Sequence, residues 1–155
     1  MLNVVRQDGL QRPSAVGIMT GNYSIPSTLR TARLLLRPIA VSDADDVFAY
    51  GSDPQVTKYV TWPTHRTIDD ALDFVQRRVR AYAAGPVLNW GITEGDGKPL
   101  IGCIGINAIS DEHFSGEVGY VLARPFWKRG LMTEAMRSVI DATFRHTPLN
   151  RIEAR

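Results

Sequence analysis

The sequence is poor in metal-binding and disulfide-forming residues. Its single cysteine, Cys103, lies in the apolar segment 101–106, so it cannot close an internal disulfide or supply a cysteine pair for zinc. We expect it to be a small buried side chain. The three histidines, His65, His113 and His146, are too scattered along the chain to indicate a metal site. We therefore predict no metal.

Long apolar runs are also lacking. No run approaches the roughly 20 residues that would span a bilayer, and the amino terminus does not read as a signal peptide. We therefore expect a cytoplasmic protein with no membrane partner. The 155 residues are 44% hydrophobic and 22% charged, which predicts one globular domain. The formal net charge of +2 is too small to favour nucleic-acid binding by itself.

The positive charge is concentrated near the amino terminus. The first 37 residues contain one aspartate, Asp8, and five arginines: Arg6, Arg12, Arg30, Arg33 and Arg37. Residues 1–30 have little hydrophobic periodicity and several Gly, Pro and Ser, which predicts a flexible basic leader before a domain at 31–155. Contact of this leader with ribosomal RNA or an anionic partner is a weaker alternative to a solvated tail.

The rest of the chain has the patterns of several helices and strands. An apolar strand at 33–37 is followed by a short helix capped by Ser42 and an amphipathic helix capped by Thr67. From residue 88 the apolar period changes to two, which predicts antiparallel strands at 88–92, 100–109 and 117–122. A helical stripe from Met132 to Thr143 and an extended pattern from Arg151 follow. The expected fold is α/β (α+β), a mixed, mostly antiparallel sheet flanked by helices.

The segment 119–135 joins a strand, a basic loop and the start of a helix. The first turn of a helix leaves backbone N–H groups without partners and carries the positive end of the helix dipole, so it binds anionic oxygens. Gly130 lets the backbone approach a phosphate closely, and Lys128 and Arg129 add charge. The arrangement suits a diphosphate, although a plain turn before a helix has the same local pattern.

Several motifs in a fixed order carry a family resemblance. They are TARLLLRP at 31–38, SDPQVT at 52–57, GEVGY at 116–120 and WKRGLMTEA at 127–135. With the order of strands and helices, they resemble the GNAT superfamily, particularly its ribosomal-protein alanine and serine N-acetyltransferases, over about residues 31–155. The family usually has glycine or another small or polar residue where Lys128 stands, and Gln or Arg where Trp127 stands. We expect Trp127 to pack rather than to stack on adenine.

The resemblance implies acetyl-CoA as the co-substrate, with its acetyl carbonyl near Val121. It implies that a strand backbone binds the pantetheine arm and that the basic loop binds the pyrophosphate. The residues implied are Tyr120, Val121 and Leu122 on the strand, and Lys128, Arg129, Gly130, Leu131, Met132 and Thr133 in the loop. Tyr120 is expected in the core rather than as an acid, and Glu134 as a partner of the helix dipole.

Transfer to an amine requires a base, because an amine of ordinary pKa is mostly protonated at neutral pH. Glu117 is the first candidate, since it projects from the strand near the expected acyl site. Glu153 is the second, because related N-terminal acetyltransferases carry a glutamate there. For each, a solvent-facing strand carboxylate is the alternative. Trp62 and His65 are candidates for the acceptor pocket, with simple loop packing as the alternative.

The resemblance also implies a further helix and two more strands after residue 155, which would supply an asparagine for the cofactor and a tyrosine acid. We therefore expect a C-terminally incomplete domain, with an unpaired edge beside the 117–122 strand that could support a homodimer. The predicted function is transfer of an acetyl group from acetyl-CoA to a primary amine by direct attack. The alternatives are an inactive, truncated acyl-CoA-binding or interaction module and a different phosphate-ligand protein. A protein amino terminus, a polyamine, an amino acid and an aminoglycoside all remain open as acceptors.

Overall fold

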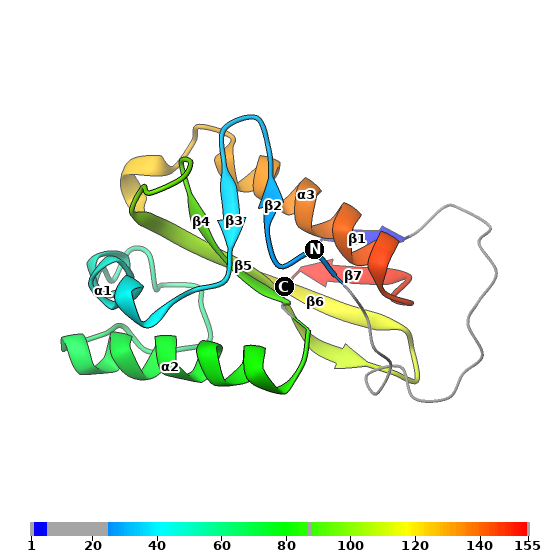
Figure 1. The fold of residues 1–155 in the computed structure, drawn as a ribbon, viewed down its shortest axis with the longest axis horizontal. Helices are drawn as coiled ribbons and strands as arrows, with labels where there is room; N and C mark the ends of the chain where they lie inside the picture. The colour runs from blue at the N-terminus through cyan, green and yellow to red at the C-terminus, as the bar shows by residue number, and fades with distance from the viewer. Residues whose placement is uncertain (1, 6–24, 87, 155) are drawn as a thin grey trace.

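The computed structural model describes residues 2–5, 25–86 and 88–154. Their strands form one sheet in the order β1-β7-β6-β5-β4-β3-β2 (Figure 1). The strands are β1 Leu2–Val5, β2 Leu29–Arg30, β3 Leu35–Arg37, β4 Asn89–Thr93, β5 Leu100–Ser110, β6 Ser115–Leu122 and β7 Arg151–Ala154. All neighbours are antiparallel except β6 and β7, which are parallel. The predicted fold class is confirmed.

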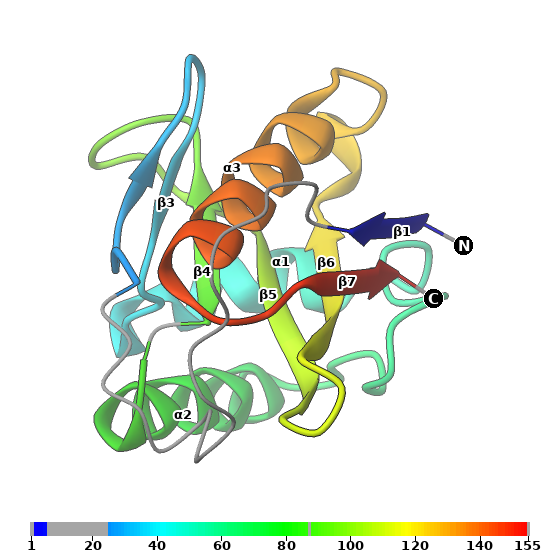
Figure 2. The same ribbon diagram turned by 90° about the vertical axis from the view of Figure 1, so that its right-hand side faces the viewer.

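Helices cover both faces of this sheet. They are α1 Ala44–Gly51, α2 Ile68–Ala84 and α3 Leu131–His146, with short 3-10 turns η1 Val41–Asp43 and η2 Arg124–Phe126. Figures 1 and 2 show α3 on one side of the sheet and α2 on the other. None of the helices in the described ranges is both long and apolar enough to cross a membrane.

Each face of the sheet has its own apolar core. On the α3 face, Leu131, Ala135 and Val139 are almost fully buried, at the four-residue spacing that puts side chains on one helix face. On the other face, Val121 of β6 packs with residues of α1 and α2, including Val75. Successive residues of a strand alternate between the two faces, so β6 contributes to both cores.

Of the two predicted helix caps, the structure confirms one and contradicts the other. At Thr67 the prediction is confirmed, because α2 begins at the next residue and the Asp70 carboxylate accepts the Thr67 N–H at 3.0 Å. At Ser42 the prediction is wrong. Asp43 caps this turn instead, accepting the Ala40 N–H at 2.7 Å and two guanidinium N–H groups of Arg37 at 2.8 Å each. Burial acts to raise the pKa of Asp43, but these hydrogen bonds outweigh it and lower the pKa.

The predicted flexible leader, residues 1–30, contains a strand at each of its ends. Leu2–Val5 forms β1, which pairs antiparallel with β7, and Leu29–Arg30 forms β2, which pairs with β3. Residues 6–24 of the predicted leader lie outside the described residues. The edge of β6 that was expected to be unpaired is taken by β7 over Ser115–Glu117, with β1 beyond it (Figure 2). Both strands reach this edge through contacts distant in sequence, which local patterns do not reveal.

Candidate active site

The sheet splits where β6 and β7 separate. Their pairing covers Ser115–Glu117 and ends there, so from Val118 onward β6 has no strand partner on that side among the described residues. Backbone N–H and C=O groups on this side of β6 are therefore available to a ligand, except the Leu122 carbonyl, to which Trp127 Nε1 donates.

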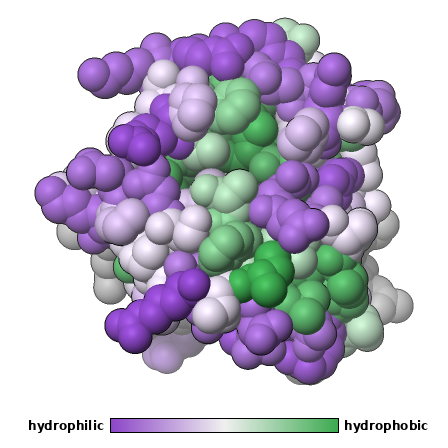
Figure 3. All heavy atoms as spheres, turned by 90° about the vertical axis from the view of Figure 1, so that its left-hand side faces the viewer, coloured by the Kyte–Doolittle hydropathy of each residue, from purple (hydrophilic) through white to green (hydrophobic). Residues whose placement is uncertain are grey.

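A cavity of about 870 Å³ lies along this part of β6. Its wall is formed by residues 117–122 of β6 and residues of the 55–62 loop. Its end is formed by residues 126–128 and 130–133, before and within the first turn of α3. Arg78, Asn89, Cys103, Asn107 and Ala108 complete the lining. Figure 3 shows the face to which α1 and η2 belong, where apolar side chains gather in a band bordered by hydrophilic ones.

The start of α3 leaves backbone N–H groups without a side-chain cap. Gly130 is its N-cap in the left-handed conformation, with φ of 74°, and no side chain caps the helix. The first helical hydrogen bond runs from the Glu134 N–H to the Gly130 carbonyl at 3.1 Å. The preceding N–H groups, those of Leu131, Met132 and Thr133, therefore have no partner within the helix. Together with the helix dipole they suit the oxygens of a diphosphate.

Lys128 holds the position at which the resemblance implies a glycine or small residue. Its φ is 59°, in the left-handed region that glycine adopts without strain. The loop thus keeps a glycine-type turn although a lysine occupies it. Lys128 also lines the cavity, whereas Arg129 does not, because its guanidinium pairs with Glu94 at 2.8 Å.

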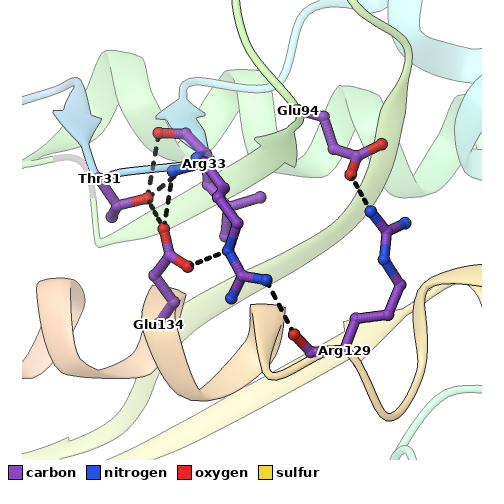
Figure 4. Close-up of polar contacts among 6 residues, drawn as sticks. Thr31, Arg33, Glu94, Arg129 and Glu134 are labelled. Atoms are coloured by element: carbon purple, nitrogen blue, oxygen red, sulfur yellow. Dashed lines mark hydrogen bonds and ion pairs between the residues drawn. The ribbon is translucent and has the colours of Figure 1, made fainter.

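Glu134 fastens this loop to the amino-terminal part of the sheet (Figure 4). Its carboxylate accepts hydrogen bonds from the Thr31 hydroxyl at 2.5 Å, the Arg33 N–H at 2.9 Å and the Arg33 Nε at 2.7 Å. Arg33 in turn donates from Nη1 to the Arg129 carbonyl at 2.9 Å. We call these four residues the loop clasp. The Thr31 hydroxyl is the main cause of a lowered pKa of Glu134. Glu134 thus has specific partners beyond the helix dipole.

The strand residues implied for the pantetheine arm all line the cavity, but in different ways. Val121 is buried toward α1 and α2, and Leu122 is buried toward α3. Tyr120 is 48% exposed, so the prediction that it belongs to the core is wrong: beyond the split, its side of β6 lacks a covering strand. Trp127 lines the cavity and donates from Nε1 to the Leu122 carbonyl at 2.6 Å.

The two candidate bases are neighbours. Glu117 and Glu153 are paired in the parallel register of β6 and β7, which puts both side chains on the α1 and α2 face. Glu117 lines the cavity, while Glu153 lies next to it outside the lining, with Arg151 Nε 3.2 Å from its Oε1. The structure therefore brings Glu117 into the site and leaves Glu153 one strand away.

Of the two predicted acceptor residues, the structure brings one to the cavity. Trp62 lines it, whereas His65 lies behind Trp62, is only 6% exposed and packs against the rings of Trp62 and Phe74 at 4.9 and 5.9 Å. Burial is the main cause of a lowered pKa of His65. Sequence reasoning missed Asn89 and Asn107, which reach the cavity only through strand register.

Within the described residues, no group of three or more His, Cys, Asp or Glu side chains could hold a metal ion. Comparison with known proteins defines the class of this protein as an acyltransferase. The chain matches the family described as an acetyltransferase (GNAT) domain over residues 33–155, and it belongs to that family.

Known proteins agree with this assignment. The chain is 37% identical over 128 residues to the uncharacterized N-acetyltransferase p20 of Bacillus licheniformis, covering 83% of this chain and 72% of the relative. It superposes on the GNAT-family acetyltransferase of Bacillus anthracis with a TM-score of 0.71 and 26% identity, over 82% and 72% of the two chains. A putative ribosomal-protein-serine acetyltransferase from Vibrio cholerae has the same fold, with a TM-score of 0.68 and 23% identity over 84% and 74%.

Proposed function

We propose that this protein transfers the acetyl group of acetyl-CoA to a primary amine. The observation that carries the proposal is the uncapped start of α3 at one end of the cavity, with Glu117 at the other end. A diphosphate bound by the N–H groups of Leu131–Thr133 would direct a pantetheine arm along the open side of β6. The thioester would then lie near Val121, on the way to Glu117.

The residues present fit this ligand. Gly130 keeps the approach to the first-turn amides open, since a Cβ there would meet only Arg33 Nη2, at 3.6 Å. Lys128 supplies a positive charge at the cavity wall beside these amides. Beyond the split, β6 offers N–H and C=O groups that no strand occupies among the described residues. We propose Tyr120, Val121 and Leu122 for the arm, and the segment from Lys128 to Thr133, with Arg129 acting from outside the cavity, for the pyrophosphate.

Glu117 is the proposed general base. Its carboxylate takes a proton from the protonated amine, directly or through a water, so that the nitrogen lone pair becomes available. The nitrogen attacks the thioester carbonyl, a C–N bond forms and the C–S bond breaks. The sulfur leaves as a thiolate. The nitrogen of the new amide loses its second proton, and the thiolate takes up this proton, directly or through water, to give the free thiol of CoA. Glu153, the register neighbour of Glu117, is the second candidate and is proposed to act beside it.

The domain proposed for this reaction is residues 31–155, which the family match over 33–155 supports. The likeness to the Vibrio cholerae protein, at 23% identity, shows the fold alone. This likeness therefore does not identify the acceptor, and a ribosomal protein is one candidate among several amines.

Turnover tests this proposal. The protein is incubated with acetyl-CoA and a mixture of amines, thiol release is followed by absorbance, and acetylated amines are identified by mass spectrometry. We expect Glu117→Gln to lower kcat by about 100-fold or more while acetyl-CoA binding is kept. Glu112→Gln, in the exposed turn before β6, is the matched control and should retain wild-type rates. Unchanged turnover in Glu117→Gln would exclude it as the base, and no thioester aminolysis with any amine would contradict the function.

A further inference from the structure

The floor of the cavity near Glu117 is built from Gly119 and the carboxamides of Asn89 and Asn107, and Asn89 covers a second glycine, Gly105. Gly105 and Gly119 are register partners on β5 and β6, and Asn89 on β4 pairs with Gly105. A Cβ on Gly105 would collide with the Asn89 side chain, and one on Gly119 would lie 2.8 Å from Asn107 Nδ2. The two carboxamides thus lie over the glycines. Neither forms a hydrogen bond within the described part of the chain, so both are available to a polar ligand.

A positive charge faces this floor from α2. Arg78 lines the cavity, and its guanidinium carbon lies 5.0 Å from the centre of the Phe74 ring. Phe74 packs on Trp62, another lining residue, at 5.5 Å. Burial raises the pKa of the Cys103 thiol on β5, and the nearby charge of Arg78 acts against that rise. Arg78 is therefore held over the middle of the sheet.

Arg78 has no carboxylate partner in the described part of the chain. The ion pairs there leave out all three cations that line the cavity, Arg78, Lys58 and Lys128. A partly buried arginine that packs on an aromatic ring, lines a cavity and has no hydrogen bond to the described residues is suited to bind a carboxylate or phosphate.

The position of Arg78 separates it from the phosphate end of the site. The first turn of α3 lies on the opposite face of the sheet from α2 (Figures 1 and 2). Arg78 and Cys103 both line the cavity, and Cys103 is the register partner of Val121, the residue beside which the acetyl carbonyl is proposed to lie. An anion bound by Arg78 would consequently lie at the acyl end of the cavity, near the reacting carbonyl.

We propose that the acceptor is an anionic amine, in which a carboxylate or a similar anion stands near the reacting nitrogen, and that Arg78 binds this anion. This inference rests on the proposed acetyl transfer. The amine faces Glu117, the anion faces Arg78 with Lys58 nearby, and the carboxamides of Asn89 and Asn107 bind polar atoms between them. Diamines and polyamines lack the anion and place a second cation against Arg78, so the site discriminates against them.

Matched acceptors that differ by one charge test this selectivity. Free amino acids are compared with their α-amides, and dipeptide amides with glutamate at the second position are compared with the same amides carrying glutamine. The first pair represents a free amino acid and the second a peptide amino terminus. Each is titrated into the protein saturated with CoA, which measures binding without turnover, and kcat/KM is then compared at equal concentrations of neutral amine. We expect the anionic member of at least one pair to bind about tenfold or more tightly.

Substitutions test whether Arg78 causes the preference for anionic acceptors. Arg78→Gln should reduce the preference for the anionic member about tenfold, and Arg78→Lys should restore part of it. Arg77→Gln removes the same charge from the neighbouring, exposed position of α2, which does not line the cavity, and should leave the preference unchanged. Acetyl-CoA affinity should be equal in all of them, and thermal unfolding confirms that each variant folds.

The outcomes separate this inference from the proposed function. Three results would overturn the inference and leave acetyl transfer standing. The first is a preference for neutral amides or diamines, and the second is no binding of any acceptor to the CoA complex. The third is an Arg78→Gln variant that weakens acetyl-CoA binding but keeps the acceptor preference. No binding of acetyl-CoA by the folded wild-type protein would overturn the proposed function, and the inference with it.

Discussion

Replacing Glu134 by glutamine tests whether the loop clasp stabilises the phosphate loop. The carboxylate of Glu134 accepts three hydrogen bonds, one from Thr31 and two from Arg33, and Arg33 holds the Arg129 carbonyl. A glutamine side chain keeps the shape but has no charge and one acceptor oxygen. We therefore expect both a loss of stability and weaker binding at the start of α3.

The size of the effect follows from exposure. Hydrogen bonds to a charged group contribute about 1.5–3 kcal/mol when protected from water. The side chains of Glu134 and Arg33 are 19% and 49% exposed, so solvent screening reduces the ion-pair part. The expected net loss is about 1–2 kcal/mol, or a fall in Tm of roughly 2–8 °C for a chain of this size.

Urea and thermal unfolding of Glu134→Gln measure this loss, and acetyl-CoA titration measures the change at the loop. Asp141→Asn is the matched control, because Asp141 pairs with Arg145 on the same helix with both side chains exposed. It should change the free energy of unfolding by less than about 0.5 kcal/mol. In a double-mutant cycle with Arg33→Gln, we expect a coupling energy of at least about 0.5 kcal/mol. Equal small effects of Glu134→Gln and Asp141→Asn, with no coupling, would refute the reasoning.

We expect the stabilisation by the Glu134 carboxylate to depend on pH. Hydrogen bonding, first from Thr31, lowers the pKa of Glu134 below its ordinary value of 4.5. A group with a lowered folded-state pKa adds stability that is fully present above the unfolded pKa and is lost as pH falls through the folded pKa. Wild type and Glu134→Gln should therefore differ most above pH 4.5 and converge in more acidic solution.

Two further predictions concern the neighbouring loop. Lys128→Gly is expected to leave stability unchanged or raise it by up to about 1 kcal/mol, because relief of the left-handed φ offsets the greater entropy of the unfolded chain. Arg129 has no positive φ to relieve, so Arg129→Gly should lower the free energy of unfolding. Urea unfolding of both variants measures this difference. Trp127→Phe removes the hydrogen bond to the Leu122 carbonyl and should cost about 1 kcal/mol, read by thermal unfolding; no change would show that this bond contributes nothing.

Local patterns in the sequence predicted the elements well. The i, i+3, i+4 stripe of α3 and the alternation around the β4–β5 turn match the helix Leu131–His146 and the strands Asn89–Thr93 and Leu100–Ser110. These signals are local, because a helix or hairpin is specified by residues close in sequence. The basic loop was found in the same way, since Gly130 immediately precedes its helix.

Long-range contacts could not be predicted in this way. Glu134 and Thr31 are 103 residues apart, so no spacing rule links them. The exposure of Tyr120 depends on where β7 leaves β6, and the burial of His65 depends on the packing of Trp62 and Phe74. The approach of Arg78 to the cavity likewise depends on how α2 lies on the sheet. Most elements were therefore predictable, although β1 and β2 were not. At the acceptor end of the cavity Trp62 and Glu117 were predicted, whereas Arg78, Asn89 and Asn107 were not.

The most direct test of the account is isothermal titration of acetyl-CoA into wild-type protein, Gly130→Glu and Gly97→Glu. Both glycines have positive φ, 74° and 66°, but Gly97 lies in the turn between β4 and β5 with nothing within 4 Å of an added Cβ. Both variants thus carry the same added charge and similar backbone strain. The account predicts saturable binding to wild type and Gly97→Glu and none to Gly130→Glu. Binding that survives in Gly130→Glu, or no binding by the folded wild type, would contradict it.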